Sequence, residues 1–527
     1  MTEFNAGSWL VHRHVHEGHG DRIAVRRGDT TLTYAELSDL VGTATAALRA
    51  LGLRRDDRVV FVTNDDVPMF TGILAAFCGG FVAVPVSTML GAKELGTIIA
   101  DSGAAVVIAS PDYGPQVHEA LTMAPEVRHL VCDGAAPLHA PSSVTSLTWV
   151  DLIAAGEREP VEPAATLEDS WALWLYTSGT TGAPKGAMHR HASIRHVCET
   201  YGDQVLGITA DDVCFSVAKL FFAYGIGNSM FFPLSAGAAT VLEPRRPAPA
   251  VIAERMAADR PTLFFAVPTF YAALLAADLP ADTFTSVRLG VSAGEALPAP
   301  LQERFTRRFG VEIIDGIGST EALHIFLSNR PGEIQPGTTG RPVPGYDIEL
   351  RGAGGTPVPD GEPGSLHVRG ASIALGYWRR TDASRAVFLG EWLNTGDTYV
   401  RSPEGFYTCM GRSNDLLKAG GIWVSPAEVE SRLLEHPHVG EAAVVGMADE
   451  HGLDKPIACV VAKGDVTAEE LIQWCRDGLA AFKRPRQVVF LEQLPKTATG
   501  KIQRFKIREL LADHGGDDEL LAEGVSG

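Results

Sequence analysis

The chain has 527 residues, of which 45% are hydrophobic and 21% charged, and this describes a globular protein too long for one ordinary domain. Its formal net charge of −19 excludes a general binder of nucleic acids or of anionic membranes, although local basic groups can still serve one nucleotide pocket. Seven scattered cysteines without a Cys-x-x-Cys pair suggest neither a disulfide framework nor a zinc site, so a cytoplasmic protein is expected.

The N-terminal region carries no sign of export or membrane insertion. Residues 1–20 are polar and rich in histidine, without the apolar core of a signal peptide. The uncharged stretch 67–92 is long enough for a membrane helix, but Gly79, Gly80 and Pro85 divide it. It predicts instead a buried helix, a glycine turn and a buried strand.

Residues 21–165 alternate helical and strand patterns, which is typical of a parallel sheet flanked by helices. Within them, residues 31–37 predict a strand that runs into a helix, with Thr33 and Glu36 at the spacing of a capping box. Residues 132–170 are rich in Pro, Ala and Ser and are expected to cross the surface. Short apolar strands are expected at 58–62, 104–109, 239–242, 262–266 and 288–292.

The second half of the chain predicts three further regions. Residues 185–330 show the same alternation of helical and strand patterns as residues 21–165. Residues 335–410, rich in Gly and Pro, predict a distorted β-barrel or roll with strands at 347–351 and 364–369. A small α+β domain should follow, and the acidic tail after 514 should fray. The elements expected in the small domain are helices from about 426 and 467 and strands at 442–445, 457–461 and 488–491.

The strongest chemical signal is a loop of small hydroxyl residues and glycines after an apolar strand, Tyr176-Thr-Ser-Gly-Thr-Thr-Gly-Ala-Pro-Lys-Gly186. Glycines let the backbone approach a polyphosphate, hydroxyls donate without bulk, and Lys185 adds a positive charge. It is not a Walker loop, because Pro184 replaces the second glycine and Gly186 follows the lysine. A flexible polar linker is the plain alternative.

This loop resembles the phosphate loop of the adenylate-forming superfamily, which comprises acyl-CoA synthetases, peptide-synthetase adenylation domains and luciferases. The resemblance covers nearly the whole chain, and it is greatest to benzoate-CoA ligases and related aryl-CoA ligases. It implies a large N-terminal domain, residues 1–411, of two parallel-type αβ sheets and a distorted β-barrel, and a small mobile α+β domain, residues 412–527. It also implies that the loop binds ATP through Thr177, Ser178, Gly179, Thr180, Thr181 and Lys185.

A second motif, Ile-Asp-Gly-Ile-Gly-Ser-Thr-Glu at 314–321, follows a β-branched run and should leave a strand end. Thr320 can donate to a phosphate, and Glu321 is a hard oxygen ligand suited to Mg²⁺. By itself the string could be a capped helix N-terminus. The resemblance assigns catalytic roles to Thr320 and Glu321, and it implies that Asp315, with Gly316, reads the adenine amino group while Ile317 covers the ring, where an aromatic is more usual in the family.

Three shorter motifs complete the nucleotide site that the resemblance implies. Ser-Ala-Gly-Glu at 292–295 matches the turn between the adenine and acyl pockets, and a plain strand-to-helix turn would look the same. Asp397 matches the ribose-binding carboxylate, although Thr-Gly-Asp also forms simple turns. Arg412 would be a second ribose or phosphate contact. The nucleotide contacts expected from these motifs are Gly294, Glu295, Asp397 and Arg412, and Ala293 should border the acid.

The small domain carries the remaining catalytic expectations. Asn414 occupies the family's hinge position, where Asp or Lys is more usual, and Asn tolerates unusual backbone angles. Gly420 and Gly421 resemble the glycines beside the coenzyme A tunnel, with an ordinary loop as the alternative. Lys501 matches the catalytic lysine, which can bridge the acid carboxylate and the α-phosphate, with a solvated lysine as the alternative.

The acid pocket is expected to be a flat and mostly apolar slot suited to a planar ring. A core histidine is the alternative for His324, and His189 and His191 are expected to be local hydrogen-bonding residues without a catalytic role. Phe221 and Phe222 are expected in the core. The residues expected to line the slot are Ala223, Tyr224, Ala293, Gly316, Gly318, His324 and Ile325.

These motifs predict an enzyme that uses ATP and Mg²⁺ to activate an aromatic carboxylic acid as its adenylate and transfers it to coenzyme A. One alternative is a separate aryl-adenylating enzyme that loads a carrier protein. Another is a binding protein on an inactive fold, although retention of Lys185, Thr320, Glu321, Asp397 and Lys501 counts against it. A monomer or homodimer without nucleic-acid or membrane partners is expected, and the sequence does not specify the acid.

Overall fold

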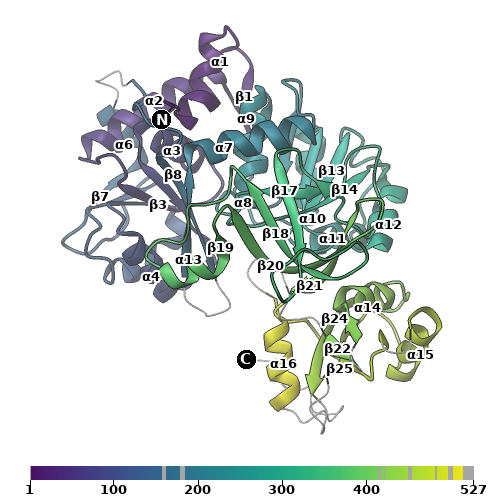
Figure 1. Cartoon of the computed structure of the whole chain (residues 1–527). Coiled ribbons are helices and arrows are strands. Elements are labelled where there is room, and N and C mark those ends of the chain that lie inside the picture. Colours follow the sequence, from purple (N-terminus) through teal and green to yellow (C-terminus); the bar gives the residue numbers. More distant parts are fainter. Residues whose placement is uncertain are drawn as a thin grey trace.

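The computed structural model has a large body with a smaller unit beneath it (Figure 1). No helix among the residues it describes is both long and apolar enough to cross a membrane. The described residues are 2–156, 162–178, 184–412, 417–419, 422–448, 454–480, 483–496 and 502–513.

The first large sheet has seven strands in the order β7-β6-β5-β3-β4-β8-β9, with parallel neighbours except for β8 and β9. Strand β3 is buried on both faces, as its continuous apolar run requires: Val59 and Phe61 pack in one core, and Val60 and Val62 pack in another. The strands are β3 (Arg58–Val62), β4 (Val82–Pro85), β5 (Val106–Ala109), β6 (His129–Cys132), β7 (Thr145–Thr148), β8 (Trp171–Ser178) and β9 (Pro184–Arg190).

The second large sheet has nine strands in the order β16-β15-β14-β13-β12-β10-β11-β1-β2, parallel in its centre and antiparallel at both edges. The expected strands of the second unit lie here within two residues of their predicted limits. The strands are β1 (Ile23–Arg27), β2 (Thr30–Thr33), β10 (Val213–Ser216), β11 (Ala239–Val241), β12 (Leu263–Ala266), β13 (Leu289–Ala293), β14 (Ile313–Gly318), β15 (Ile325–Ser328) and β16 (Arg341–Pro342).

The two αβ units are not separate in sequence, contrary to the expectation from chain order. Strand β1 lies in the first unit by sequence but pairs parallel with β11 of the second sheet. Strand β9 begins the second unit by sequence but pairs with β8 of the first sheet. The stretch 132–170 is also more regular than expected, because it contains β7 and the helix α6. A short strand pairs with whichever sheet offers it unpaired backbone groups, and local composition does not reveal which sheet that is.

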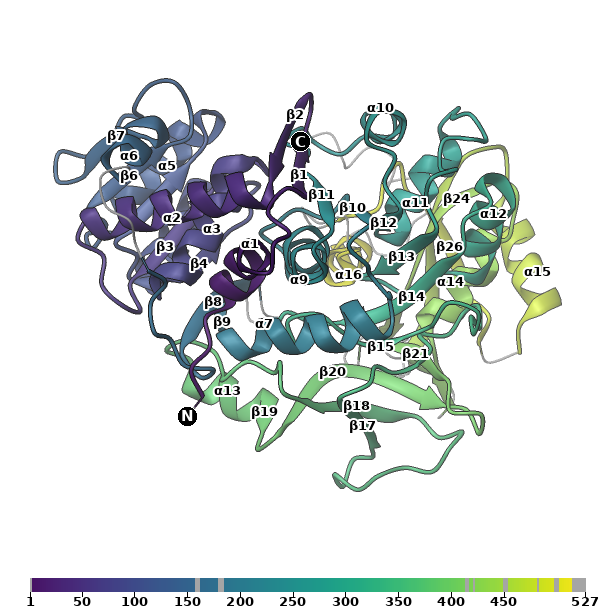
Figure 2. The ribbon, with the colours of Figure 1, turned by 90° about the horizontal axis from the view of Figure 1, so that it is seen from above.

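Helices cover both faces of the large sheets (Figure 2). The predicted capping box is confirmed: Thr33 and Glu36 cap α2, and the uncharged stretch forms α3, a turn at Gly80 with φ of 72°, and β4. The helices of the large body are α1 (Arg13–His16), α2 (Tyr34–Ala50), α3 (Val67–Gly79), α4 (Ala92–Ser102), α5 (Gly114–Leu121), α6 (Trp149–Gly156), α7 (His191–Val197), α8 (Ala223–Ile226), α9 (Phe232–Ala236), α10 (Pro249–Asp259), α11 (Pro268–Ala276), α12 (Ala299–Phe309) and α13 (Thr381–Val387).

The Gly- and Pro-rich region forms a curled sheet of five strands that makes half a barrel, in the order β17-β18-β20-β19, with β21 also paired to β20. All its neighbouring strands are antiparallel. The strands are β17 (Tyr346–Arg351), β18 (Gly364–Gly370), β19 (Phe388–Leu389), β20 (Trp392–Arg401) and β21 (Tyr407–Arg412).

The small unit has the expected α+β composition, with a three-stranded sheet in the order β24-β25-β26 and a two-stranded hairpin. Within this unit Glu430 connects the helix that carries it to two other elements. The Glu430 carboxylate accepts from the Val444 N–H at 2.8 Å and from Arg504 at 2.7 Å. The elements are β22 (Leu417–Ala419), β23 (Ile422–Val424), α14 (Pro426–Leu434), β24 (Val439–Ala448), β25 (Asp454–Ala462), α15 (Ala468–Gly478), β26 (Gln487–Phe490) and α16 (Arg504–Asp513).

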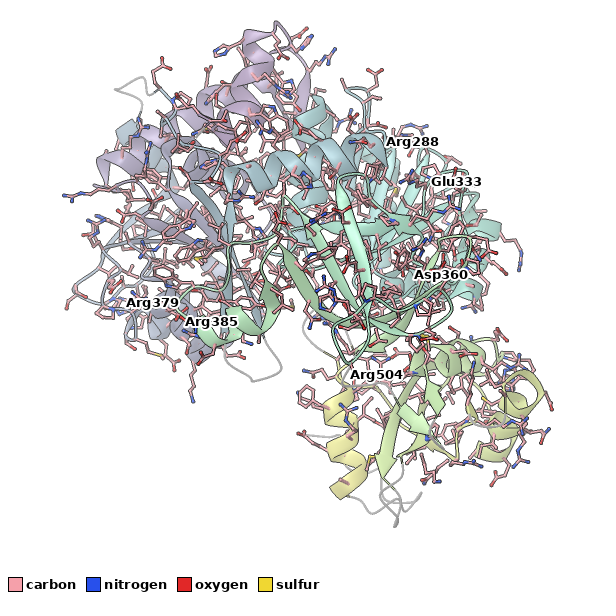
Figure 3. The ribbon with its side chains drawn as sticks, in the orientation of Figure 1. Arg288, Glu333, Asp360, Arg379, Arg385 and Arg504 are labelled. Carbon is pink, nitrogen blue, oxygen red and sulfur yellow. The ribbon has the colours of Figure 1, made fainter. Side chains whose placement is uncertain are left out.

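A buried carboxylate fixes the amino ends of three neighbouring strands in the second sheet. Asp212, which precedes β10, accepts from Thr262 Oγ1 at 2.6 Å and from Arg288 Nε and Nη2, both at 2.9 Å. Thr262 and Arg288 directly precede β12 and β13, and Figure 3 labels Arg288. Burial alone would raise the pKa of Asp212, but the hydrogen bonds from Arg288, Thr262 and the Thr209 N–H lower it.

Asp212→Asn should therefore lower the free energy of unfolding by about 1–3 kcal/mol at pH 7, the range for hydrogen bonds to a charged group. Because the folded pKa lies below that of the unfolded chain, this stability exists above about pH 4 and disappears as the pH falls through the folded pKa. Urea unfolding of both proteins from pH 7 down to about pH 2 measures the difference and its loss in acid.

Asp360→Asn is the matched control, since Asp360, which Figure 3 labels, makes an exposed ion pair with Arg401 at 3.5 Å and no other ion pair among the described residues. It should change the free energy of unfolding by no more than about 0.5 kcal/mol. Equal effects of the two substitutions would contradict the role given to Asp212.

Candidate active site

The predicted phosphate loop connects two antiparallel strands at the edge of the first sheet. Thr177 of β8 pairs with Lys185 of β9, so the lysine begins the returning strand. Lys185 Nζ lies 5.6 Å from the centre of the Tyr377 ring. The backbone of Ser178 belongs to β8, whereas Gly179, Thr180 and Thr181 lie outside the described residues.

The adenine motif lies at the carboxyl ends of two parallel strands, β13 and β14. Ser292 pairs with Asp315, and Ala293 pairs with Gly316, so the two motifs are adjacent. Gly294 follows β13 with φ of 95°, a conformation that disfavours any other residue, and Glu295 is half-buried beside it. The parallel register therefore brings both predicted adenine-site motifs to one edge of the sheet.

Asp315 is a buried carboxylate with an unused acceptor. It is 5% exposed, and its Oδ1 atom has no hydrogen-bond partner among the described residues. Burial raises its pKa well above the ordinary value. An amino group that donated to Oδ1 would remove this cost, while Ile317, two residues along the strand and only partly buried, can cover a ring.

Glu321 is oriented by a tyrosine that the sequence analysis did not identify. The Tyr377 hydroxyl donates to Glu321 Oε1 at 2.7 Å, and Tyr377 is 7% exposed. Burial first, and then the Glu321 charge, raise the pKa of Tyr377, while Arg412 lowers it. Glu321 Oε2 and Thr320 Oγ1 make no hydrogen bond within the described ranges, so both oxygens are available to a metal ion or phosphate.

Residues 371–378 join this turn to the phosphate-loop hairpin. The Ala374 N–H donates to Glu321 O at 2.8 Å, and the Ser372 hydroxyl donates to Ala322 O at 2.7 Å. On the other side, backbone hydrogen bonds connect Met188 with Gly376 and Leu375, and Trp378 with Gly186. One extended segment thus contacts both the turn that carries Thr320 and Glu321 and the strand that carries Lys185.

Two histidines after the loop form hydrogen bonds over long distances in sequence. His189 Nε2 donates to Thr320 O at 2.8 Å, and His191 Nδ1 accepts from the Ala6 N–H at 3.0 Å. Burial lowers the pKa of His189 to about 4 and that of His191 to about 3, so both rings are neutral at pH 7. They are hydrogen-bonding residues, as predicted, but their partners are not local.

Asp397 and Arg412 face each other across β20 and β21. Arg412 Nε lies 3.1 Å from Asp397 Oδ1, and Arg412 also donates to Thr395 O at 2.9 Å. The pKa of Cys409 is raised to about 11, chiefly by burial and further by the charges of Asp397 and Asp315. The ion pair of Asp397 and Arg412 therefore joins β20 to the last residue of β21.

Of the residues expected to line the acid slot, some are partly exposed and others are buried in the core. Ala223 and Tyr224 are half-buried on α8, and the Tyr224 hydroxyl donates to Val291 O at 3.0 Å. His324 is 2% exposed and lies against three aromatic rings, Tyr201, Tyr224 and Phe232. Burial lowers the pKa of His324 to about 3, and its Nδ1 has no described partner.

Gly316 and Gly318 of β14 were expected to leave room for the ring of the acid. The structure shows another reason for glycine at these positions. A Cβ at Gly316 would lie 2.9 Å from Ile325 Cγ2, and one at Gly318 would lie 2.4 Å from His324 O. Their absent side chains admit the antiparallel strand β15, so the slot is not opened on that side. Ile325, 1% exposed, is correspondingly a core residue that packs against β14. Phe221 is buried as expected, whereas Phe222 is only partly buried.

The predictions of a hinge, a coenzyme A tunnel and a catalytic lysine fall on residues that the structure does not describe. Asn414, Gly420, Gly421 and Lys501 lie outside the described residues. Tyr377 could not have been selected from sequence, because Leu-Gly-Tyr-Trp in a Gly-rich stretch gives no signal until its pairing with Glu321 is known.

The donor set fits ATP with Mg²⁺. The unpartnered Asp315 Oδ1 suits an adenine amino group, Asp397 suits ribose hydroxyls, and Glu321 presents a carboxylate oxygen of the kind that Mg²⁺ prefers.

Comparisons with known proteins agree with this geometry. The family model described as AMP-binding enzyme matches residues 12–378, and the one described as AMP-binding enzyme C-terminal domain matches 428–501. The chain is 43% identical to a benzoate–CoA ligase of Thauera aromatica over 96% of each chain. It is similar to the solved structure of a benzoate CoA ligase from Burkholderia xenovorans LB400, with 44% identity, a TM-score of 0.87, and 96% of this chain and 100% of that chain covered. For the anthranilate CoA ligase AuaEII in complex with anthranoyl-AMP, the identity is 37%, the TM-score 0.92 and the coverage 98% and 99%.

If Tyr377 orients a metal-binding Glu321, Tyr377→Phe should weaken binding of ATP with Mg²⁺ by about threefold to tenfold, the value of one hydrogen bond. Binding of ATP in EDTA should not change, because no metal then needs the carboxylate. Calorimetry with and without Mg²⁺ measures both.

Tyr346→Phe is the control, since it removes a buried tyrosine hydroxyl that contacts Ser372 Oγ at 2.7 Å and not Glu321. Equal loss of affinity with and without Mg²⁺, or the same loss in the control, would contradict the role of Tyr377.

Proposed function

We propose, from the premise that the chain belongs to the aryl acid–CoA ligases of the AMP-binding enzyme family, that it ligates a benzoate-like or fused-ring aromatic acid to coenzyme A and releases AMP and pyrophosphate. The observation that carries the proposal is Asp315, a buried carboxylate with an unused acceptor beside the Glu321 turn. A reducing cytoplasm suits its seven free thiols, six of them buried.

The first half-reaction forms the adenylate. The acid carboxylate attacks the α-phosphate, the bond to the β-phosphate breaks, and pyrophosphate leaves. In this proposal Asp315 accepts from the adenine amino group, Asp397 from the ribose, and Thr320 and Lys185 contact phosphate oxygens. Mg²⁺, when bound at Glu321, offsets the charge of the leaving group. Lys501 would stabilise the charge that moves from the carboxylate to the phosphate.

The second half-reaction transfers the acyl group. The thiol of coenzyme A attacks the acyl carbon, AMP leaves, and one proton is released. We propose that the chain divides into 1–411 and 412–527, that the small domain turns about Asn414 between the halves, and that Gly420 and Gly421 border the thiol path. The two family models, which match 12–378 and 428–501, support this division.

The proposed acid site lies between Ala223 and Tyr224 of α8 and Ala293 of β13. The Tyr224 hydroxyl donates to Val291 O of β13 at 3.0 Å and lies 3.4 Å from Ala266 O of β12, so its ring is fixed. A rigid aromatic wall favours a planar ring over a flexible chain, which would lose more conformational entropy on binding.

A panel of benzoate, substituted benzoates, a fused-ring acid and hexanoate, with ATP and coenzyme A, tests the function. We expect AMP and thioester from at least one aromatic acid and turnover of hexanoate at least about tenfold lower, because about 1.4 kcal/mol of discrimination suffices. Hexanoate used as well as every aromatic acid would contradict the proposed acid class.

The same panel separates the alternatives. Adenylate without thioester would favour a carrier-loading enzyme, and the absence of acid-dependent pyrophosphate release would favour an inactive binding protein.

Two substitutions test the alternation of half-reactions. Lys501→Ala should slow pyrophosphate release by about a hundredfold or more, the cost of one charged donor, yet still convert supplied aryl-adenylate and coenzyme A to thioester. Gly421→Leu should form adenylate but fail to transfer it, because its side chain would obstruct the thiol path. Both half-reactions are measured for both variants. Equal losses of rate in the two half-reactions of each variant would contradict the alternation and indicate a single fixed site.

A further inference from the structure

The histidine-rich N-terminal segment, which the proposed ligase reaction does not use, gathers three metal-binding side chains. His14, Glu17 and His19 each offer a ligand atom, and these atoms all lie within 4.8 Å of one another. His14 lies on α1, at the top of the large body and on the opposite side from the small unit (Figure 1). The cluster is therefore remote from the site at Asp315 and Glu321.

The backbone explains why residues 14, 17 and 19 converge. Glu17 is the C-cap residue of α1, and Gly18 follows with φ of 82°, so the chain reverses. The His19 N–H donates to His14 O at 2.7 Å, and the Gly18 N–H donates to Val15 O at 3.1 Å, the two hydrogen bonds of a Schellman motif. The motif returns His19 to the turn that carries His14, and Glu17 Oε2 lies 4.0 Å from His19 Nδ1.

His14 is already arranged as a metal ligand usually is. Its ring is 4% exposed, packs against Tyr34 at 4.5 Å, and contacts Leu234 O through Nε2 at 2.6 Å. A carbonyl oxygen can only accept, so Nε2 carries the proton and the lone pair is on Nδ1. Nδ1 makes no hydrogen bond to the described residues. Such a backbone partner fixes the tautomer and orientation of a metal-bound imidazole.

We propose that His14, Glu17 and His19 bind one Zn²⁺ ion, with water as the fourth ligand. Two imidazoles and one carboxylate form a borderline ligand set that suits zinc. Tetrahedral bonds of about 2.0–2.2 Å need ligand atoms about 3.4 Å apart. Only Glu17, exposed, and His19, partly exposed, must therefore move, by about 1 Å, onto the fixed His14 ring. The carboxyl end of a helix also favours a cation.

Two guanidinium groups border the cluster without occupying it. Arg13 Nε is 4.0 Å from Glu17 Oε1, but Arg13 keeps its other contacts, to Ser235 O at 2.7 Å and over the Trp9 ring at 4.8 Å. Arg22 Nη1 and His14 Nδ1 both lie beside Gly237, at 3.5 and 3.4 Å from the position of a Cβ there, but Arg22 is exposed and its side chain can turn to solvent. A bound ion would fasten the reversed turn at α1 to the neighbouring helix α9, which supplies Leu234 and lies beside α1 in both views (Figures 1 and 2).

The test is zinc titration of the tag-free, EDTA-treated full chain without nucleotide, by calorimetry and by thermal unfolding. We expect one equivalent of zinc per chain and a rise in Tm that grows with zinc concentration. His19→Ala and Glu17→Gln should each weaken binding by at least about tenfold, since loss even of a second-shell group costs this much. Co²⁺ in place of zinc should give the visible absorption of a tetrahedral site, lost in the same variants.

His16→Ala is the matched control, an exposed histidine on the same helix outside the cluster, and it should bind zinc like the wild type. The rival sites are the surface pairs His118–His139 and His436–His438. No zinc uptake, uptake unchanged in His19→Ala, or uptake lost in His139→Ala or His438→Ala would overturn the proposal. Because nucleotide is absent throughout, these results do not depend on the ligase reaction.

Discussion

The extended segment 371–378 is the constraint on which the geometry of the site depends. It leaves the curled sheet, pairs with β9 of the first large sheet, and hydrogen-bonds to the turn after β14 of the second. Three sheets thus share one short stretch of backbone. Buried backbone groups must be paired, so a shift of any of the three sheets would break these hydrogen bonds. This fixes Lys185, Thr320 and Glu321 relative to one another.

Several polar side chains at this junction are arranged in a way that suits binding of an anion and a metal ion. His189 is held neutral by burial and supports the turn through Thr320 O, so it adds no competing charge. Tyr377 holds one oxygen of Glu321 and leaves the other available. Asp315 keeps an unused acceptor. Burial of Asp315 without a partner for one oxygen costs free energy in the unliganded protein. A bound amino group that donated to this oxygen would offset that cost.

The proposed zinc site lies in another region of the molecule, and its residues are brought together in a different way. The ligase site depends on contacts between elements far apart in the sequence, whereas His14, Glu17 and His19 are gathered by one local motif. Local motifs form in many proteins without ligands, so the fixed tautomer of His14, imposed by Leu234 from α9, is the feature that distinguishes this cluster from an ordinary helix end.

The sequence by itself determined the local features and their order. The capping box at Thr33 and Glu36, the helix, turn and strand over 67–92, and the strands of the small unit follow from patterns of a few neighbouring residues. The family followed from motifs whose chemistry requires particular residues at fixed spacing. Asp315 was expected to face adenine, and the structure adds that its acceptor is buried and unused.

Only the tertiary structure decided which strands share a sheet and which residues support the site. Strands β1 and β9 exchange sheets relative to their order, because edge pairing depends on distant backbone groups. Gly316 and Gly318 admit β15, and Ile325 fills the core, which no pattern of spacing could reveal. Tyr377 and His189 act through partners 56 and 131 residues away, and contacts at such separations exist only once the chain has folded.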